Sequence, residues 1–373
     1  MNSQVILITA NSTWNIYNFR LPLIRQLQLN GHRIVVVARK DSFADRLQAM
    51  NIEYIPLEQL YPTKKGLLNN FRLLLEYRSI IRRVQPSIII SFTIKPNIFS
   101  GVIARWFHIP FLPTLTGLGS LFTGNIKPNQ LLVILYKYAL KKAHKVIFHN
   151  DDDLAEFVQL KLIPREQGRV IPGSGVDVQQ FSATRAQNKD SFVFLCIARL
   201  IREKGVLDFI HASGRLLQAN LKNVSFRLIG PYDPEDDRSI DEEILRKWEE
   251  EETCHYGGFV EDIKAEIQDA TVFVLPSMRE GMPRAVLESM SIGRPVITTD
   301  VPGCRQAIEH KKNGIIVPPG DVSALAEAMS DMMKMSFEER LKMGSYGQKL
   351  VFQKYSAEVI VKQYEDILNE MMP

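Results

Sequence analysis

Short apolar runs alternate with amphipathic helical patterns along this 373-residue chain. Strands are predicted first at Val5–Thr9, Arg33–Ala38, Ile52–Pro56, Ser87–Phe92, Phe111–Leu115 and Lys145–His149. The helical patterns between them are Tyr17–Leu29, Leu67–Val84, Asn97–Phe107 and Asn129–Lys142. Strands that alternate with helices in this way predict a parallel sheet that is covered by helices on both faces.

A second series of the same kind follows. Its predicted strands are Phe192–Ile197, Ser225–Ile229, Val272–Leu275, Pro295–Thr298 and Gly314–Val317. The segment Pro172–Gly175, rich in Pro and Gly, and the polar stretch Thr184–Asp190 indicate a connection between two domains. We therefore expect an N-terminal domain over residues 1–172, a C-terminal domain over 173–354 and a last helix over 355–373.

The composition is that of a soluble globular protein, with 45% hydrophobic and 24% charged residues. Its three cysteines, Cys196, Cys254 and Cys304, are widely spaced, so neither a disulfide framework nor a zinc site is expected. No apolar run approaches the roughly 18 residues of a spanning helix. These features favour a protein of the reducing cytoplasm that does not cross a membrane.

Charge is unevenly distributed along the chain. Residues 1–172 hold 22 Lys and Arg against 10 Asp and Glu, whereas the remainder holds 24 against 32. A basic half attracts phosphates, for example those of anionic lipid headgroups or of a polyprenyl diphosphate. No nucleic-acid-binding module accompanies the basic residues, so nucleic acid is not an expected partner.

The stretch 276–288 places two carboxylates, Glu280 and Glu288, across a strand-to-helix junction. Thr271–Leu275 predicts a buried strand, Gly281 and Pro283 a turn, and the following residues a helix. Open α/β sheets bind ligands where a helix begins beside the carboxyl end of a strand, and the N–H groups of that helix suit phosphate. We expect the two carboxylates to bind two ends of one polar ligand.

A basic loop follows an earlier predicted strand, 193–197. It contains Arg199 and Lys204 and ends at Gly205, and a helical pattern comes next. A guanidinium fork and an ammonium at the carboxyl end of a strand suit a diphosphate. The two loops therefore predict a site for a phosphorylated ligand.

Together, these motifs resemble those of the retaining glycosyltransferases of family 4. The loop Gly257-Gly258-Phe259-Val260 between them is similar to the nucleobase-contacting loop of that family. The resemblance extends over nearly the whole chain and is strongest over residues 191–320. It implies the GT-B fold, an α/β architecture of two Rossmann-like domains with parallel sheets facing a central cleft. It also implies that the last helix crosses back to the first domain.

The resemblance implies roles for individual residues. Arg199 and Lys204 would hold the leaving diphosphate without a metal ion, and Glu280 would accept hydrogen bonds from the donor sugar. The backbone of Gly281 and Met282 would approach sugar and phosphate beside Pro283, which has no N–H. Glu288 would bind the ribose hydroxyls, while Phe259 and Val260 would contact the nucleobase. Neither a metal nor another cofactor is expected; the nucleotide sugar is a substrate.

The N-terminal half departs from the family pattern in two loops. Residues 9–15 lack the glycines that in many members let the backbone approach the diphosphate, so the side chains of Asn11 and Ser12 would donate hydrogen bonds to it instead. Thr116 stands near a position where relatives often have a His or Glu that contacts the donor sugar. Thr116 can hydrogen-bond there, but it cannot serve as a base. Residues 15–22 are similar to a segment of bacterial enzymes that elongate lipid-linked oligosaccharides. Arg20 lies in this segment and is a candidate for binding a phosphate of the acceptor.

Three further charged sites have simpler interpretations. Arg284 stands where members of the family usually have an uncharged residue. Its side chain either contacts a phosphate of the ligand or is an exposed side chain of its helix without a role. Asp151–Asp153 are expected to cap a helix that begins near Leu154. Asp236 and Asp237 lie in a polar loop and are not expected to bind a metal.

The expected function is a retaining, metal-independent glycosyltransferase on the cytoplasmic face of the plasma membrane. It would move a sugar, N-acetylgalactosamine or a related hexose, from a UDP-sugar to a lipid-linked or surface-polysaccharide acceptor. The basic N-terminal domain would dock on anionic membrane. A nucleotide-sugar epimerase and an inactive scaffold subunit remain alternatives. The identity of the sugar, the acceptor hydroxyl, any catalytic base and the oligomeric state stay open.

Overall fold

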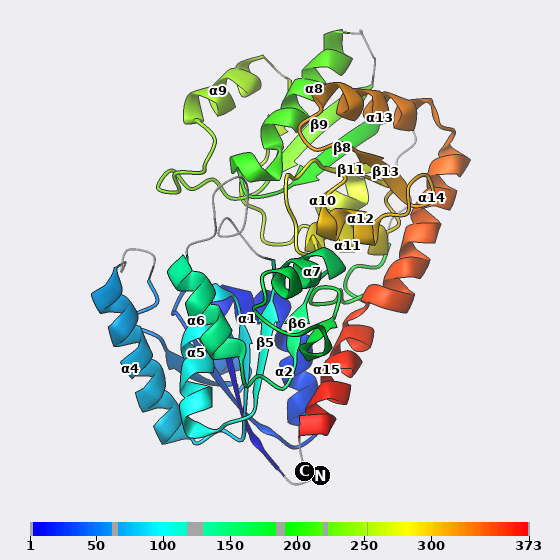
Figure 1. The fold of residues 1–373 in the computed structure, drawn as a ribbon. Coiled ribbons are helices and arrows are strands. Elements are labelled where there is room, and N and C mark those ends of the chain that lie inside the picture. Colours follow the sequence, from blue (N-terminus) through cyan, green and yellow to red (C-terminus); the bar gives the residue numbers. More distant parts are fainter. Residues whose placement is uncertain are drawn as a thin grey trace. The chain divides into compact units, whose positions relative to one another are not determined.

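The computed structural model describes residues 3–61, 66–117, 130–183, 191–218, 223–251 and 253–371. They form two compact units (Figure 1). Unit 1 comprises Met1–Gly175 and Ala357–Pro373, and unit 2 comprises Val176–Ser356. Among the helices of the described ranges, none has both the length and the apolar character that crossing a membrane requires.

Unit 1 is built on a seven-stranded sheet with the order β3-β2-β1-β4-β5-β6-β7. All neighbouring strands are parallel, so their carboxyl ends meet at one edge. The strands are β1 (Val5–Ala10), β2 (Arg33–Ala38), β3 (Glu53–Pro56), β4 (Ile88–Phe92), β5 (Phe111–Leu115), β6 (Val146–Phe148) and β7 (Gly168–Val170). The sequence did not predict β7, because three residues are too few to show a period.

Helices cover both faces of this sheet. They are α1 (Thr13–Phe19), α2 (Leu21–Leu29), α3 (Ala44–Ala49), α4 (Leu67–Val84), α5 (Ile94–Phe107), α6 (Gln130–Leu140), α7 (Asp151–Gln159) and α15 (Ala357–Met371), with the short 3₁₀ helix η2 (Arg165–Gln167). Alternate residues of β1 point to opposite faces. Leu7 joins the core that contains residues of α4, α5 and α7, whereas Ile6 and Ile8 join the core with α2 and α15.

Two helix expectations in unit 1 need correction. The predicted helix over residues 17–29 is two helices, because α1 ends before Arg20 and α2 starts after it. Pro22 lies in the first turn of α2, where a missing N–H costs nothing. Helix α7 begins at Asp151, and its cap is Asn150, whose side chain accepts from the N–H of Asp153 at 2.8 Å. The three aspartates therefore lie in the first turn, where negative charge is favoured by the helix dipole.

Arg20 is buried in unit 1, and its guanidinium lies 3.8 Å from the centre of the Phe92 ring. The expectation that Arg20 meets an acceptor phosphate is therefore wrong, because the side chain is enclosed rather than presented at the surface. The positive charge of Arg20 also interacts electrostatically with His149. Burial, and then the charge of Arg20, lower the pKa of His149 to about 3.

His149 should make the stability of the protein depend on pH. Because its folded pKa lies below the ordinary value of 6.5, the unfolded chain binds the extra proton first as the pH falls. Stability from this group is complete above pH 6.5 and is lost toward pH 3. Between pH 7 and pH 5, we expect wild type to lose about 2 kcal/mol more than H149Q in urea unfolding. The exposed-site variant H255Q should keep the wild-type dependence; equal slopes for wild type and H149Q would contradict the assignment.

Unit 2 carries a six-stranded sheet with the order β10-β9-β8-β11-β12-β13, again with parallel neighbours. The strands are β8 (Phe192–Ile197), β9 (Val224–Ile229), β10 (His255–Tyr256), β11 (Val272–Leu275), β12 (Val296–Thr299) and β13 (Gly314–Val317). The two-residue β10 was not predicted, for the same reason as β7.

The helices of unit 2 lie on both faces of its sheet. They are η3 (Arg202–Lys204), α8 (Val206–Gln218), α9 (Glu242–Glu250), α10 (Lys264–Asp269), α11 (Arg284–Ser291), α12 (Pro302–Ala307), α13 (Val322–Lys334), α14 (Phe337–Leu350) and the π-helical turn η4 (Val351–Tyr355). Phe194 of β8 packs in the core with α8 and α13, whereas its neighbour Leu195 packs in the core with α11. Both faces of the strand are thus buried, which explains its continuous apolar run.

Candidate functional site

The strand order of unit 2 reverses direction between β8 and β11. From β8 the chain continues outward through β9 and β10, and it then returns to β11 on the other side of β8. At such a switch point, the loops after the two central strands diverge and leave room for a ligand. The loop after β8 contains Arg199 and Lys204, and the loop after β11 contains Glu280. The fold therefore brings both predicted loops to one edge of the sheet.

The two loops are joined by backbone contacts. The N–H of Met278 donates to the carbonyl of Glu203 at 2.8 Å, and the hydroxyl of Ser277 donates to the same carbonyl at 3.1 Å. Gly205, with φ +66°, ends η3 so close to the second loop that a Cβ there would lie 1.9 Å from the carbonyl oxygen of Pro276. Only glycine fits both the conformation and the space.

Lys204 and Glu280 meet across this junction. The Nζ atom of Lys204 lies 2.5 Å from Oε1 of Glu280, and the side chains are 21% and 11% exposed. Two opposite charges that are largely withdrawn from water interact more strongly than a surface pair. Residues that are 76 positions apart in the sequence thus form one charged pair at the switch point.

The first turn of α12, the helix that follows β12, supports the Glu280 segment. The N–H of Gly303 donates to the carbonyl of Glu280 at 3.2 Å, and a Cβ at Gly303 would lie 2.4 Å from the carbonyl oxygen of Gly281. Cys304 follows, and burial, together with the charge of Glu280, raises the pKa of its thiol to about 12. Gly303 is not among the predicted site residues, although the pair Pro302-Gly303, four positions after the end of a predicted strand, is a turn signal.

Gly281, Met282 and Pro283 form a buried turn between Glu280 and α11. Pro283 occupies the N-cap position, where its lack of an N–H is harmless. The backbone N–H groups of a first helical turn suit an anion. The turn therefore places a helix start directly after the Lys204–Glu280 pair.

Glu288 lies within α11 and is buried. Its Oε1 atom accepts from Nε of Arg284 at 2.6 Å. Burial raises the pKa of Glu288, while the positive charge of Arg284 opposes this shift. The sequence suggested a phosphate contact or a role-free surface position for Arg284, and neither interpretation includes this pairing with Glu288. A buried carboxylate needs a partner, and Arg284 supplies it four residues earlier on the same helix.

Arg199 is exposed and belongs to a second charged group. Asp236 accepts two hydrogen bonds from Arg238, at 2.8 Å from Nε and 2.6 Å from one Nη, and this pairing lowers the pKa of Asp236 to about 2, with a smaller contribution from Arg199. Both carboxylate oxygens of Asp236 thus accept hydrogen bonds from Arg238. Arg238, which is not among the predicted site residues, adds a second guanidinium beside Asp236.

The loop after β10 holds Phe259 and Val260. The ring of Phe259 is exposed and Val260 is half-buried. The carbonyl of Gly258 accepts from the N–H of Gly230 at 2.9 Å, so this loop is fixed to the end of β9. An exposed ring on a fixed loop suits stacking against a planar group.

Asn11 and Thr116 lie in unit 1, after β1 and β5, which are separated in the sheet only by β4. Asn11 is exposed, and Thr116 is half-buried. The strand order of this sheet reverses between β1 and β4. Thr93 follows β4 with φ +70°, a strained conformation for a β-branched residue that no sequence pattern predicts. Residues 118–120, which follow Thr116 in the same loop of the sequence, lie outside the described residues.

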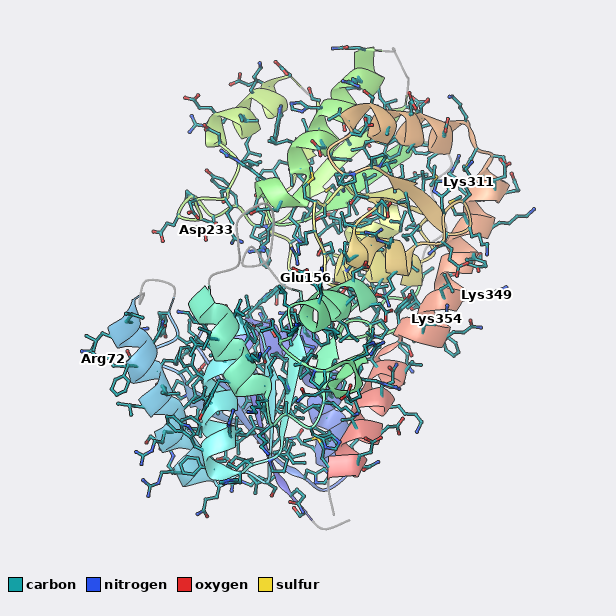
Figure 2. All side chains as sticks on the ribbon, viewed as in Figure 1. Arg72, Glu156, Asp233, Lys311, Lys349 and Lys354 are labelled. Atoms are coloured by element: carbon teal, nitrogen blue, oxygen red, sulfur yellow. The ribbon has the colours of Figure 1, made fainter. Side chains whose placement is uncertain are left out.

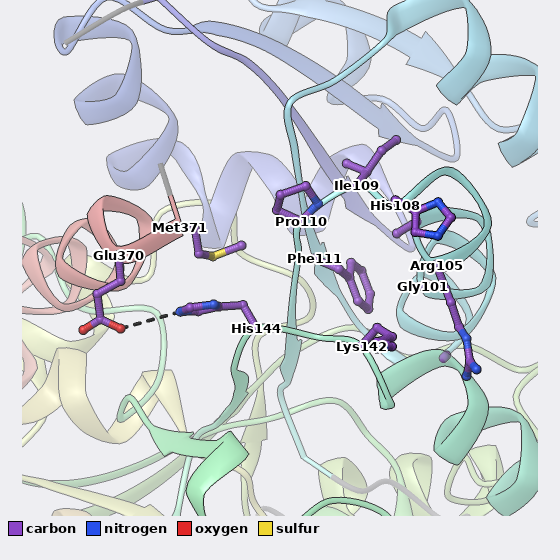
Figure 3. A pocket seen from close by; sticks show the side chains of 12 residues that line it. Gly101, Arg105, His108, Ile109, Pro110, Phe111, Lys142, His144, Glu370 and Met371 are labelled. Atoms are coloured by element: carbon purple, nitrogen blue, oxygen red, sulfur yellow. Dashed lines mark ion pairs between the residues drawn. The ribbon is translucent and has the colours of Figure 1, made fainter. Parts of the chain in front are cut away.

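A separate pocket of about 580 Å³ lies at the opposite edge of the same sheet, where β5 begins at Phe111 (Figure 3). His144 and Glu370 face each other at its border, 3.6 Å apart, and Arg105 and Lys142 add positive charge. None of the predicted site residues lines it. The pocket therefore does not belong to the candidate site.

Comparisons with known proteins agree with this architecture. Residues 5–150 match the family model described as glycosyl transferase 4-like, and residues 177–350 match the model for glycosyl transferases group 1. The chain is 26% identical to the N,N'-diacetylbacillosaminyl-diphospho-undecaprenol alpha-1,3-N-acetylgalactosaminyltransferase of Campylobacter jejuni, over 96% of this chain and 97% of the relative. It is 25% identical to the UDP-Gal:alpha-D-GlcNAc-diphosphoundecaprenol alpha-1,3-galactosyltransferase of Escherichia coli, over 71% and 70% of the two chains.

Solved structures show the same fold. A glycosyltransferase from Rickettsia africae superposes with a TM-score of 0.81 at 17% identity, over 100% of this chain and 99% of the other. HepE from Anabaena, in complex with UDP, also gives 0.81, at 18% identity over 98% and 100%. The expected fold class, two α/β domains with parallel sheets as in GT-B proteins, is confirmed.

Proposed function

The chain belongs to the family 4 glycosyltransferases, whose two characteristic domains it carries, and from this premise we propose a specific reaction. The protein moves a sugar, N-acetylgalactosamine or a related hexose, from a UDP-sugar to a lipid-linked glycan or polysaccharide acceptor. The transfer retains the anomeric configuration and needs no metal ion. The observation that carries this proposal is the Lys204–Glu280 pair at the switch point of unit 2.

The chemistry follows from what the reaction must stabilise. The bond between the anomeric carbon and the diphosphate oxygen breaks, and its electrons stay on the leaving phosphate. Lys204 and Arg199 offset this growing charge. The acceptor oxygen bonds to the anomeric carbon on the same face, and its proton passes to the leaving phosphate. When the donor binds, the carboxylate of Glu280 accepts hydrogen bonds from hydroxyl groups of the sugar in place of its bond to Lys204. These hydrogen bonds hold the anomeric carbon in position.

The remaining residues of unit 2 bind the rest of the donor. Glu288, kept as an acceptor by Arg284, takes the ribose hydroxyls, as an acidic residue does in dinucleotide sites. The exposed ring of Phe259, with Val260, contacts the base. Gly281 and Met282 bring the backbone toward the sugar and phosphate beside Pro283. Unit 2 is thus the proposed donor-binding domain.

Unit 1 is the proposed acceptor-binding domain. Its loops after β1 and β5 contain Asn11 and Thr116, whose side chains can donate hydrogen bonds to a ligand. The names of the relatives from C. jejuni and E. coli describe transfer to sugars on diphospho-undecaprenol, which supports a lipid-linked acceptor. The UDP complex of HepE supports a UDP-sugar. Such an acceptor places the enzyme on the cytoplasmic face of the plasma membrane.

Donor binding predicts a thermal shift. UDP-sugars should raise the melting temperature of the purified protein, because a ligand at about 100 times its Kd adds about 2.7 kcal/mol to stability. The shift should exceed that given by GDP-sugars, and E288Q should reduce it by removing the charge that binds the ribose. H255Q, outside the proposed binding residues, should retain the full shift. Equal shifts for wild type and E288Q would contradict the ribose contact.

Product analysis separates the alternatives. Incubation of the UDP-sugar that gives the largest shift, with and without a short-chain polyprenyl-diphosphate sugar, should give a glycosylated lipid only when the acceptor is present. A new nucleotide sugar without acceptor would indicate an epimerase. No binding of UDP by calorimetry would indicate a scaffold subunit. Addition of EDTA should leave the transfer rate unchanged; a loss that Mg²⁺ restores would contradict the metal-independent reaction.

A further inference from the structure

Helix α4 exposes an apolar and basic stripe along its outer side. The stripe, called here the α4 stripe, consists of Leu67, Leu68, Phe71, Arg72, Leu75, Arg78, Arg82 and Arg83. Its four apolar side chains are between 45% and 75% exposed. Figure 2 shows the labelled Arg72 directed outward from α4. Apolar side chains grouped on one exposed face mark an interaction surface more strongly than single ones do.

The opposite side of α4 is firmly packed. Leu73, Tyr77 and Ile81 belong to the core of unit 1. The hydroxyls of Tyr77 and Thr9 are hydrogen-bonded at 2.8 Å, and the amide of Asn69 donates to the carbonyl of Gln59 at 2.9 Å. The helix therefore has a fixed rotation, and the exposure of its apolar stripe does not result from loose docking.

The charge of α4 has a single sign on the outer side. All four arginines of the helix are exposed, and Glu76 is its one acidic residue. The carboxylate of Glu76 accepts from the backbone N–H groups of Glu58 and Gln59, at 2.7 and 3.1 Å, and so is held toward the unit. An exposed face with apolar residues and uncompensated arginines is complementary to a surface that is both apolar and anionic.

We propose that the α4 stripe docks on an anionic bilayer, with its apolar side chains in the interface and its arginines at lipid phosphates. A second copy of the chain is a poorer occupant, because a twofold contact would bring two sets of four arginines together. Helix α6, which packs against α5 as α5 packs against α4 (Figure 1), adds exposed Ile134, Lys137 and Tyr138, and exposed Lys141 follows its end. Helix α6 and the residue after it thus also expose both apolar and basic side chains.

The position of the stripe along α4 connects it to the proposed acceptor site, and in this respect the inference rests on the proposed function. In a parallel sheet with crossover helices, each helix begins at the carboxyl edge of the strands. Tyr77 contacts Thr9 near that edge, and Leu68 lies about 14 Å earlier along the helix. The apolar half of the stripe therefore lies on the side of unit 1 that carries Asn11. A bilayer there would present the diphosphate of a lipid-linked acceptor to this edge.

Co-sedimentation with vesicles tests the docking. The full-length protein should bind vesicles of phosphatidylcholine with phosphatidylglycerol, and bind pure phosphatidylcholine about tenfold or more weakly. The variants F71S/L75S and R78E/R82E should each lower binding to anionic vesicles about tenfold or more, through lost insertion and reversed charge. Raising NaCl to about 1 M, where the Debye length is about 3 Å, should release most of the wild-type protein.

Matched variants in unit 2 serve as controls. L341S/F352S changes two exposed apolar residues, and K342E/K349E reverses two exposed lysines. Both should bind anionic vesicles within about twofold of wild type, since neither changes the α4 stripe. All four variants should keep the melting temperature and the shift produced by UDP, because the changed side chains are exposed and lie outside the donor-binding residues.

The outcomes distinguish this inference from the proposed function. Unchanged vesicle binding by both α4 variants would overturn the docking surface, whether or not UDP binds. A dimer that F71S/L75S converts to monomer, with no vesicle binding by wild type, would assign the stripe to a second copy and also overturn it. Normal vesicle binding without a UDP shift would leave the docking surface in place and contradict the donor site.

Discussion

K204M is expected to lower the rate of sugar transfer by about 100- to 1,000-fold, the loss that follows removal of one preorganised group at a developing charge. The same substitution leaves the carboxylate of Glu280, which is only 11% exposed, without its partner. Unfolding stability should fall by about 2–4 kcal/mol as a result. Transfer is measured with the UDP-sugar and lipid acceptor, and stability by urea unfolding.

An exchange of the two charges separates structure from chemistry. The double variant K204E/E280K restores a pair of opposite charges, so stability should recover most of the loss, while transfer should stay as low as in K204M. The surface pair Lys312–Glu309 provides a control, since K312M breaks an ion pair of 3.0 Å outside the candidate site and should leave transfer unchanged. Full transfer by K204M, or by the exchanged pair, would remove Lys204 from the mechanism.

G205A is expected to destabilise the protein by about 3 kcal/mol or more, the range of severe steric and backbone strain. The added Cβ would lie 1.9 Å from the carbonyl oxygen of Pro276, and φ is +66°. Because the clash is with backbone, no side-chain rotation relieves it. The loops of Lys204 and Glu280 must separate, so UDP binding should weaken as stability falls.

G320A is the matched control. Gly320 also has a positive φ, +76°, but a Cβ there would meet only the end of the Met278 side chain, at 3.7 Å. This substitution carries the conformational cost alone, about 1 kcal/mol. Both variants are measured by urea unfolding. Equal losses would show that the close approach of Gly205 to Pro276 is not the dominant constraint.

Local patterns in the sequence determined most elements of the fold. Leu67–Val84 was predicted with its observed bounds, because its apolar residues recur with a helical period and one face is buried. The buried strands β2, β5 and β11 were likewise predicted at their observed bounds, since a parallel strand covered on both faces must be a short apolar run. The strands β7 and β10 were missed, because two or three residues show no period.

The sequence also identified the loops of the candidate site. A charged or Gly-containing loop directly after a buried strand is expected at the carboxyl edge, where ligands bind. That inference holds for Arg199, Lys204 and Glu280 without knowledge of the strand order. The burial of Arg20 against Phe92 could not be inferred, because an arginine in a helical pattern is usually exposed.

The sequence by itself determined which segments are strands and helices and which loops follow them, because these depend on periodicity within a few residues. Only the tertiary structure decided which loops meet. The strand order puts β11 beside β8 and β12 beside β11, so Lys204 pairs with Glu280, and the N–H of Gly303 donates to the carbonyl of Glu280. Such pairings depend on packing between segments far apart in the chain, which no local pattern encodes.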